Sequence, residues 1–485
     1  EGREADYGRG RRRAACLMAY APTLAWAPLG GPEEAQIVAA HAERMQRYAD
    51  FLRIPSVSAV PEHAADCRKA AEWLAGELRR IGAQRVEVSE TGGHPIVVGE
   101  RMEDPALPTI VIYGHYDVQP GDPFDLWKTS PFEPIVRDGR MLGRGSADDK
   151  GQIVIHLAAL EALLRTRGRL PVNVKYLFEG EEESSSVNLE RWMAANPDRC
   201  SGDAVIISDT GFFEGNVPAL TVGLRGITYM QVDVRNSDVD LHSGGYGGSV
   251  INPANALASM IASLHDEHRH ITVPGFYDDV VELSPEDRAA FAALPFDEAK
   301  YLAGIDAKAT QGEAGYSTVE RRGGRPTLDV NGIWGGFTGD GSKTIIPAHA
   351  HAKISCRLVT AQDPARIALQ VEAALKAAAP RGLEVKVTNL GNGYPFLTPL
   401  GDPYLAAAAK ALKETFGADP LYLREGGSIP IAALFQRELS LPVVLLGFTP
   451  PDDNAHAPNE SMDLGNFEGG IRTVIRALDS IAALR

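Results

Sequence analysis

The sequence predicts an α/β protein with a mostly parallel sheet covered by helices on both faces, and a smaller α+β domain inserted into it. Short, mainly apolar runs such as 109–113, which carries no charge, and 172–178, which carries one lysine, are typical of strands buried on both faces. They alternate with helical patterns such as 64–81 and 152–165, which favours parallel pairing. Between residues 224 and 394 the pattern changes to βαββαβ, the order of a ferredoxin-like unit.

The larger domain is expected to comprise residues 33–223 and 395–485, and the smaller domain residues 224–394. Gly82 has the C′ position after a helical pattern, and Asp138-Gly139 fits the turn of a hairpin. In chain order, the expected elements are helices 33–53 and 64–81, strands 85–90, 95–98 and 109–113, hairpin 131–142, helix 152–165, strands 172–178, 204–207 and 227–235, helix 253–264, strands 327–333 and 348–358, helix 364–378, strand 383–388, helices 403–416 and 429–436, and strand 442–447.

The composition is that of a globular protein with large cores: 44% of the 485 residues are hydrophobic and 23% are charged. The formal net charge of −16 argues against a nucleic-acid or anionic-membrane partner, because both need a basic surface. Cys16, Cys67, Cys200 and Cys356 include no Cys-x-x-Cys pair. A disulfide framework and a thiolate zinc site are therefore not expected.

Residues 1–32 are expected to form a disordered extension. A basic run at 8–13 precedes an apolar stretch, as in a secretory signal, but Pro22 and Pro28 interrupt that stretch. No other run approaches the ~18 apolar residues needed to span a bilayer. The sequence therefore favours a cytoplasmic protein, with a secretory N-terminus as the alternative.

His115 and Asp117 follow the apolar run 109–113. In an open α/β sheet, ligand-binding groups lie at the carboxyl ends of the strands. A His and an Asp two residues apart suit a metal ligand and the group that orients its second ring nitrogen. Taken alone, such a pair is more often an ordinary part of a loop.

Further acids and a second His stand at other predicted strand ends and at one helix start. Asp148 precedes a predicted helix, Glu182 and Glu183 follow one predicted strand, Asp209 follows the next, and His456 follows a fourth. So many carboxylates at one edge repel one another unless cations compensate. Two His and three carboxylates can hold two divalent ions ~3.5–4 Å apart if one carboxylate bridges them. The residues alone therefore favour a dinuclear metallohydrolase.

Eight segments occur in the order found in a family of dinuclear zinc peptidases, and the chain resembles the carnosinase-like cytosolic dipeptidases of that family most closely. They are YGHYDVQP, GRGSADDKG, EGEEES, Ser208-Asp209, GLRG, DLHSGGYGG, REGGSIP and the His at 456. The resemblance covers about residues 33–485. Ser184-Ser185-Ser186 departs from the usual Ser-Gly-Ser of the family. Other relatives are aminoacylases, glutamate-releasing carboxypeptidases and succinyl-diaminopimelate desuccinylases.

The resemblance implies two divalent metal ions per chain, with His115, Asp148 and Asp209 as ligands of one and Asp148, Glu183 and His456 as ligands of the other. Zinc is the implied metal, and manganese and cobalt are alternatives because the ligand types discriminate poorly among the three.

The resemblance also implies roles for residues around the metals. Asp117 would orient His115, and Glu182 would be the general base. His242 would reach into the site of a partner subunit and stabilise the oxyanion, which implies a homodimer through the smaller, lid domain. The peptide bond between Asp148 and Asp149 should be cis.

Four residues are implied to bind a small peptide substrate. Arg357 would clamp its carboxylate, and Gly427 and Ser428 would receive its C-terminus, with Thr338 as a further pocket residue. The expected function is hydrolysis of dipeptides or short peptides with a free C-terminal carboxylate. The alternative is an amidohydrolase of N-acyl amino acids, and a non-catalytic peptide-binding protein is disfavoured by the complete set of ligands and base.

Overall fold

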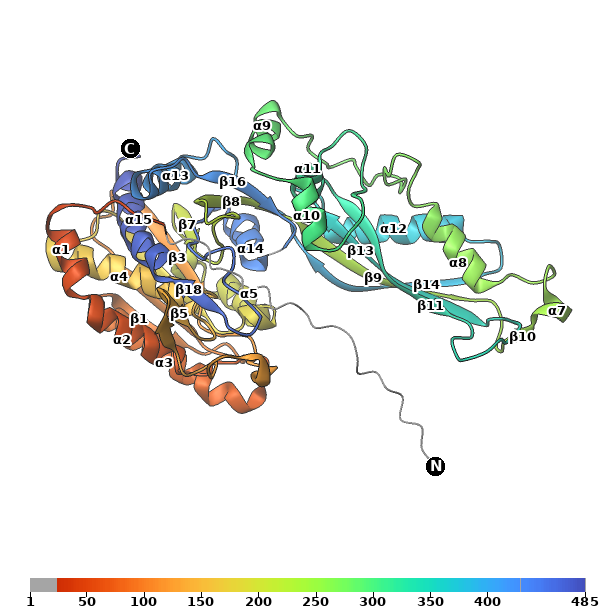
Figure 1. Ribbon diagram of the computed structural model, residues 1–485, viewed down its shortest axis with the longest axis horizontal. Helices are drawn as coiled ribbons and strands as arrows, with labels where there is room; N and C mark the ends of the chain where they lie inside the picture. The colour runs from red at the N-terminus through yellow and green to blue at the C-terminus, as the bar shows by residue number, and fades with distance from the viewer. Residues whose placement is uncertain (1–23, 428, 485) are drawn as a thin grey trace.

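The computed structural model describes residues 24–427 and 429–484. It has two lobes, each built on its own sheet (Figure 1). Within the described residues, the larger lobe has a nine-stranded sheet in the order β1-β2-β6-β3-β7-β17-β8-β15, with β16 paired to β8. The smaller lobe has a four-stranded sheet in the order β11-β13-β9-β14.

The centre of the large sheet is parallel. β3 (Thr109–His115) pairs in parallel with β6 (Asn173–Glu179) and with β7 (Ala204–Ile207), and β7 pairs in parallel with β17 (Val443–Leu445). β1 (Gln84–Ser89) and β2 (Ile96–Arg101) continue the sheet as antiparallel strands. The parallel strands therefore deliver their carboxyl ends to one edge, as the sequence predicts.

Helices cover both faces of this sheet. Alternate side chains of β3 accordingly pack into two different hydrophobic cores, one on each face. Ile110 and Ile112 pack into one core with helices α1, α3, α4, α13 and α15, and Val111 and Tyr113 pack into the other with α5 and α14. The predicted fold class is confirmed. The bounds of these helices are α1 Gly31–Ala39, α3 Ala64–Ile81, α4 Lys150–Arg167, α5 Val187–Ala195, α13 Pro403–Phe416, α14 Pro430–Leu439 and α15 Leu464–Ala482.

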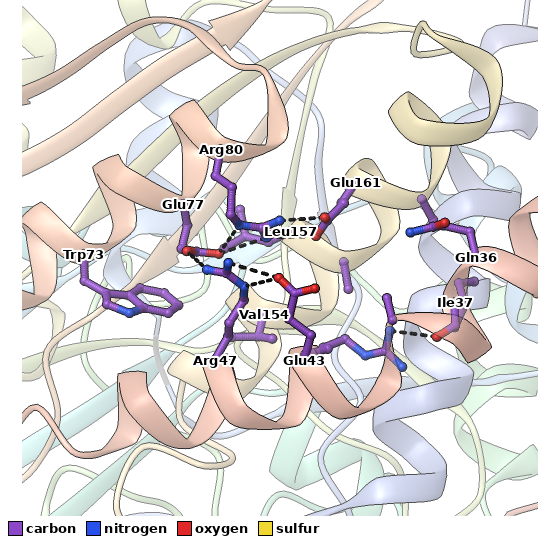
Figure 2. Close-up of a pocket in the computed structure, with 14 residues that line it drawn as sticks. Gln36, Ile37, Glu43, Arg47, Trp73, Glu77, Arg80, Val154, Leu157 and Glu161 are labelled. Atoms are coloured by element: carbon purple, nitrogen blue, oxygen red, sulfur yellow. Dashed lines mark hydrogen bonds and ion pairs between the residues drawn. The ribbon is translucent and has the colours of Figure 1, made fainter.

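A network of ion pairs ties α2 (His41–Leu52), α3 and α4 together (Figure 2). Arg47 of α2 pairs with Glu77 of α3, and Arg80 of α3 pairs with Glu77 at 2.9 Å and with Glu161 of α4 at 2.6 Å. The pocket beneath this network offers about 30 Å³, which is room for about one water molecule. The network therefore joins the three helices and does not form a ligand site.

The smaller lobe is an antiparallel sheet with helices on one face. Its strands are β9 (Gly226–Arg235), β11 (Thr327–Gly335), β13 (His349–Leu358) and β14 (Glu384–Gly393). Side chains of α8 and α12 fill the core beneath them. With α8 at Pro253–Ala262 and α12 at Pro364–Ala378, the elements follow the order βαββαβ, in agreement with the expected ferredoxin-like unit.

Several elements differ from the sequence-based expectation. The single helix expected at 33–53 is two helices, α1 and α2, which meet at Ala40. The stretch between α8 and β11, for which the sequence analysis gave no helix or strand, contains three short helices. They are α9 (Pro285–Ala293), α10 (Glu298–Gly304) and α11 (Thr318–Gly324). Strands β8 (Ala219–Leu224) and β16 (Leu421–Glu425) and helix α15 were not among the expected elements.

The remaining elements are short. They are η1 Pro61–His63, η2 Phe124–Leu126, β4 Ile135–Arg137, β5 Arg140–Leu142, η3 Glu182–Ser184, α6 Pro197–Cys200, β10 Leu241–His242, α7 Ser243–Tyr246, β12 Ile345–Ile346, β15 Phe396–Leu397 and β18 Ser461–Asp463.

The chain crosses between the lobes twice, from β8 to β9 and from β14 to β15. The two crossings touch: a Cβ on Gly226 would lie 2.6 Å from the carbonyl oxygen of Gly393 and 2.6 Å from the nitrogen of Pro395. Only glycine lets the two backbones approach this closely.

Part of the expected N-terminal extension lies outside the described residues, which begin at residue 24. The described part packs on the larger lobe, where Ala27 donates a backbone hydrogen bond to the carbonyl oxygen of Thr415 and Arg472 stacks on Trp26. Among the helices that the structure describes, none combines the length and the hydropathy needed to cross a membrane.

Candidate metal centre and active site

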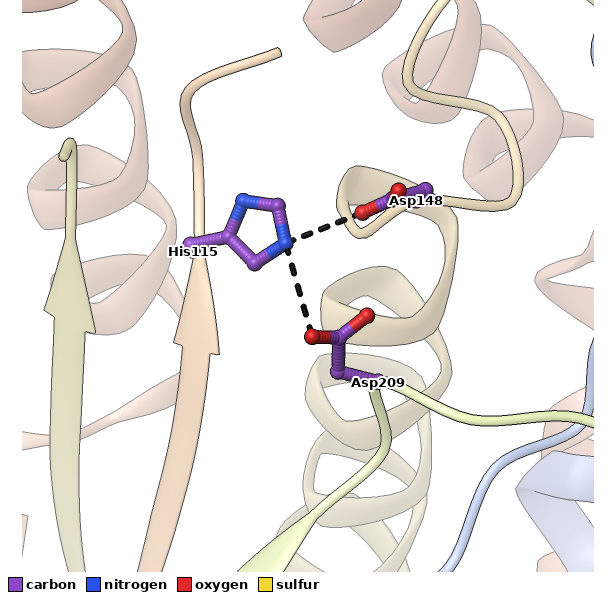
Figure 3. A group of neighbouring side chains, drawn as sticks. All are labelled: His115, Asp148 and Asp209. Carbon is purple, nitrogen blue, oxygen red and sulfur yellow. Dashed lines mark ion pairs between the residues drawn. The ribbon is translucent and has the colours of Figure 1, made fainter. Parts of the chain in front are cut away.

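Two groups of potential metal ligands share one carboxylate. His115, at the end of β3, lies with its Nε2 3.0 Å from Oδ1 of Asp148 and 4.0 Å from Oδ2 of Asp209 (Figure 3). His456 lies with its Nε2 2.9 Å from Oδ2 of Asp148 and 3.1 Å from Oε2 of Glu183. Each of the two groups of three could hold a metal ion. One oxygen of Asp148 faces each His, so its carboxylate is placed to bridge two ions.

The surroundings of His115 suit a metal ligand. The side chain is fully buried, and its Nε2 points at the Asp148 carboxylate, 3.0 Å from Oδ1. Its Nδ1 lies 3.1 Å from the carbonyl oxygen of Asp117 and 3.4 Å from Oδ1 of that residue. A protonated Nδ1 held this way directs the lone pair of Nε2 toward an ion.

Asp117 also connects the His115 loop to the acidic turn after β6. Its carboxylate oxygens accept hydrogen bonds from the backbone N–H groups of Glu182 (3.3 Å) and Glu183 (3.1 Å). One buried carboxylate therefore contacts the backbones of two neighbouring site residues and the ring of a third. The sequence analysis assigned Asp117 only to His115 and missed this second contact.

Close packing behind the ligands depends on Gly114. A Cβ at this position would lie 2.8 Å from Oδ2 of Asp149 and 2.7 Å from Cγ1 of Ile153. The same Oδ2 accepts the backbone N–H of His115 at 3.2 Å, which fixes the end of β3 against the start of α4. The peptide bond between Asp148 and Asp149 is cis, as the resemblance implied.

The carboxylates of the cluster lie close together, and their pKa values indicate that additional positive charge would stabilise them. Burial and the neighbouring Asp148 carboxylate raise the pKa of Asp209 well above its ordinary value. Hydrogen bonds with Asp148 and Glu183 raise the pKa of His456 to about 10. Burial would raise the pKa of Asp148 as well, but its bonds with His115 and His456 lower it. The carboxylates of the cluster therefore repel one another, divalent cations would compensate their charge, and the donor set of two imidazoles and three carboxylates fits such ions.

Glu182 lies beside the two ligand groups without belonging to either. Burial, together with the Glu183 and Asp148 carboxylates, raises its pKa to about 7, against the opposing effect of His115. A carboxylate with a pKa near neutrality is suited to accept and return a proton.

The other two glutamates of the acidic turn have structural contacts. Glu179 accepts hydrogen bonds from the hydroxyls of Tyr113 (2.6 Å) and Ser186 (2.9 Å). Glu181 accepts from the backbone N–H of His94 (3.2 Å). Of the glutamates in this turn, Glu182 and Glu183 therefore belong to the metal centre, and Glu179 and Glu181 hold the local fold.

The metal centre opens into a cleft of about 990 Å³ between the lobes. Asp148, Glu182, Asp209 and His456 line one part of it, and Arg357 and Gly427 line another. Three further arginines that the sequence analysis did not assign also line it: Arg225, Arg322 and Arg424. Arg225 and Arg424 belong to the GLRG and REGG segments, which were the only sequence signals for them.

Most of these arginines are unpaired. Arg424 forms an ion pair with Asp287, whereas Arg225, Arg322 and Arg357 have no carboxylate within 4.0 Å in the part of the chain that the structure describes. Burial and the charges of Arg357 and Arg322 lower the pKa of Arg225 to about 10. The cleft therefore combines the acidic metal-binding residues with four arginines, called the cationic wall below, and Glu214 and Glu425 also line it.

Two residues expected near the substrate lie elsewhere in the chain's own fold. His242 is exposed at the end of β10, which pairs with β12, at the tip of the smaller lobe farthest from the large sheet (Figure 1). Thr338 is exposed in the loop between β11 and β12. Neither lines the cleft, and Ser428 lies outside the described residues.

Comparison with known proteins places this geometry among peptidases. The chain is 33% identical over 460 residues to a Cys-Gly metallodipeptidase of Schizosaccharomyces pombe, covering 91% of this chain and 96% of the relative. It is 33% identical over 450 residues to a human Beta-Ala-His dipeptidase, covering 89% and 88%. The crystal structure of human carnosine dipeptidase 1 superposes with a TM-score of 0.73 at 31% identity, covering 94% of this chain and 100% of that one.

A model of peptidase family M20/M25/M40 matches residues 111–480. This range begins within β3 and ends within α15, so it includes all five candidate ligands and the whole smaller lobe. On this match and these relatives, the chain belongs to peptidase family M20/M25/M40.

Proposed function

We propose that the protein is a dinuclear metal-dependent hydrolase that cleaves the amide bond of dipeptides and short peptides with a free C-terminal carboxylate. The observation that carries the proposal is the cleft, which holds a two-ion ligand set and three arginines that have no carboxylate partner among the described residues. A bound dipeptide could place its amide bond at the metal ions and its C-terminal carboxylate beside the arginines. The metallodipeptidases to which the chain is similar support the same substrate class.

In this proposal, residues 33–223 with 395–485 form the catalytic domain, and residues 224–394 form the lid and dimerisation domain. His115, Asp148 and Asp209 hold one ion, and Asp148, Glu183 and His456 hold the other. The ions are zinc, with manganese and cobalt as alternatives, because His and carboxylate ligands accept all three.

The proposed metal centre predicts a stoichiometry. Metal analysis after saturation and removal of free metal should find two ions per chain in the wild-type protein. Asp209→Asn should lose one of them, because it contributes to one group only. Asp148→Asn should lose both, because it is common to both groups. One ion per wild-type chain, or the same loss in both variants, would contradict the bridging role of Asp148.

Bound metal ions would polarise the scissile carbonyl and make water a stronger acid. Glu182 would take the proton from the attacking water and pass it to the nitrogen of the leaving amine. Asp117 would keep His115 in the tautomer that directs Nε2 toward its ion. Arg357 would hold the substrate carboxylate through parallel hydrogen bonds, and Gly427 and Ser428 would receive the C-terminus.

We also propose that the protein is a homodimer through the smaller domain, with His242 and Thr338 completing the site of the partner subunit. Both residues lie at the tip of this domain, away from their own cleft (Figure 1). The tip exposes large apolar side chains, and a patch of this kind is typical of a surface that becomes buried when two subunits associate. They include Val239 (63% exposed), Ile333 (56%), Tyr246 (48%), Trp334 (44%) and Phe337 (44%).

A substrate panel tests the proposed function. Dipeptides should release free amino acids, and the same dipeptides with an amidated C-terminus should be poor substrates, because an amide does not pair with Arg357. N-acetyl and N-succinyl amino acids distinguish the alternative, an amidohydrolase of N-acyl amino acids, which has the same metal centre. Faster hydrolysis of these compounds than of every dipeptide would favour the alternative.

A further inference from the structure

Glu460 is fully buried four residues after His456, directly before β18. Its carboxylate accepts four hydrogen bonds from the segment that ends at Asp148. Oε2 accepts from Nη1 of Arg144 (2.8 Å) and from the backbone N–H of Gly145 (3.0 Å). Oε1 accepts from the backbone N–H groups of Ala147 (2.8 Å) and Asp148 (3.1 Å). Both oxygens are therefore used to hold one loop.

The backbone around Glu460 joins the same two segments. Its carbonyl oxygen accepts the N–H of Gly143 at 3.0 Å, and the next residue, Ser461, pairs with Leu142 in the β18–β5 ladder. Arg144 extends the connection, because its Nη2 donates to the carbonyl oxygen of Pro120 at 3.1 Å. Pro120 lies in the loop that follows His115, so three ligand-bearing segments meet at one buried ion pair.

We propose that Glu460 is a positioning residue for the metal centre, and this inference rests on the proposed function. Glu460 touches neither the ligand atoms nor the cleft; it acts through the backbone of Asp148 and through the end of the His456 segment. The carboxylate of Asp148 and the imidazole of His456 must converge on one ion, although 307 residues lie between them in the sequence. Glu460 fixes both with a single side chain.

The isosteric variant Glu460→Gln removes this function without removing volume. A glutamine has one acceptor oxygen and one NH₂ donor. Either the N–H groups of Ala147 and Asp148, or the guanidinium of Arg144 and the N–H of Gly145, would then face a donor. Loss of such supporting contacts around metal ligands typically costs 10–100-fold in metal affinity or activity.

The experiment measures metal affinity independently of catalysis. The metal-free full-length protein and its variants are titrated with Zn²⁺ in a chelator-buffered series, and with Co²⁺, whose visible absorption reports ligand geometry. Glu460→Gln should bind about 10–100-fold more weakly than wild type at one or both sites, with an altered Co²⁺ spectrum. Saturating metal should restore part of kcat with little change in KM, because the cationic wall is intact.

Glu313→Gln is the matched control. Glu313 forms a largely buried pair with Arg325 in the smaller lobe, through contacts of 2.7 and 2.8 Å. It shares the chemistry of the Glu460–Arg144 pair but contacts no metal ligand. The Glu313→Gln substitution should lower the unfolding temperature and leave the Zn²⁺ affinity and the Co²⁺ spectrum unchanged. A purely structural role for Glu460 would make the two variants behave alike.

Wild-type affinity at both sites in Glu460→Gln would overturn the inference. If that variant does not fold, Arg144→Lys decides the question. This substitution keeps a positive charge beside Glu460 but loses the bond to Pro120. Unchanged metal affinity and an unchanged Co²⁺ spectrum in Arg144→Lys would equally overturn the inference. Failure of the proposed function gives a different result, because the wild-type protein itself would then not bind two ions.

Discussion

Replacing Glu182 by Gln is expected to lower kcat by about 10²–10⁴-fold while both metal ions remain bound. The amide keeps the shape of the side chain and cannot accept the proton of the attacking water. Glu182 belongs to neither ligand group, so the ion count per chain should stay at two. Steady-state kinetics on the best dipeptide, with metal analysis of the same sample, measures both quantities.

Glu181→Gln is the control for this experiment. Its Oε1 accepts hydrogen bonds from the backbone N–H of His94 and from Nδ2 of Asn188, and a glutamine oxygen can accept both. Glu181 does not line the cleft. Its replacement should therefore leave kcat within a few-fold of wild type. Loss of an ion from Glu182→Gln, or retention of most of its turnover, would mean that the roles of Glu182 and Glu183 are interchanged.

Replacing His242 by Ala is expected to lower kcat by about 10²–10³-fold, the usual effect of losing one donor to a transition-state oxyanion. The proposed action in the partner's site makes this loss reversible by subunit mixing. His242→Ala and Glu182→Ala dimers should both be inactive. A mixed dimer has one site with an intact Glu182 and an intact partner His242. An equimolar, fully exchanged mixture should recover about a quarter of wild-type activity, since half of the dimers are mixed and each has one working site.

The same mixture distinguishes action within one chain. If His242 served its own cleft, each mixed dimer would have one defect in each site, and the mixture would stay inactive. Subunit exchange is verified with differently tagged chains before the assay. A protein that is monomeric at assay concentrations would contradict the proposed dimer directly.

The fold was predictable where burial leaves a simple pattern. β3, β6 and β7 lie between two layers of helices, so their sequences are mainly apolar, and Lys175 is the one charged residue in the interior of these three strands. The helices α9 and α11 were missed although each begins with a capping box, Ser284 with Asp287 and Ser317 with Glu320. These helices are short and bury few side chains, so their apolar periodicity is weak.

The ligand types were predictable from the sequence because strand ends collect at one edge of a parallel sheet. Their division into two groups came from family resemblance, and the distances around Asp148 are compatible with that division. Glu460 had no comparable signal: it is one acid among many, and its significance depends on four donors from residues more than 300 positions earlier. Long-range backbone contacts of this kind leave no local pattern.

The contact of Gly226 with Gly393 and Pro395 brings the two chain crossings together at one place. A rotation of the lobes about this place would have to break the Arg424–Asp287 ion pair, and it would make the smaller lobe a lever arm. Arg225 adjoins this place and would hardly be displaced. His242 and Thr338, at the far tip, would travel the longest arc for the same angle (Figure 1). Small backbone adjustments at the crossings are thus amplified most at the two residues that the proposed dimer needs to place accurately.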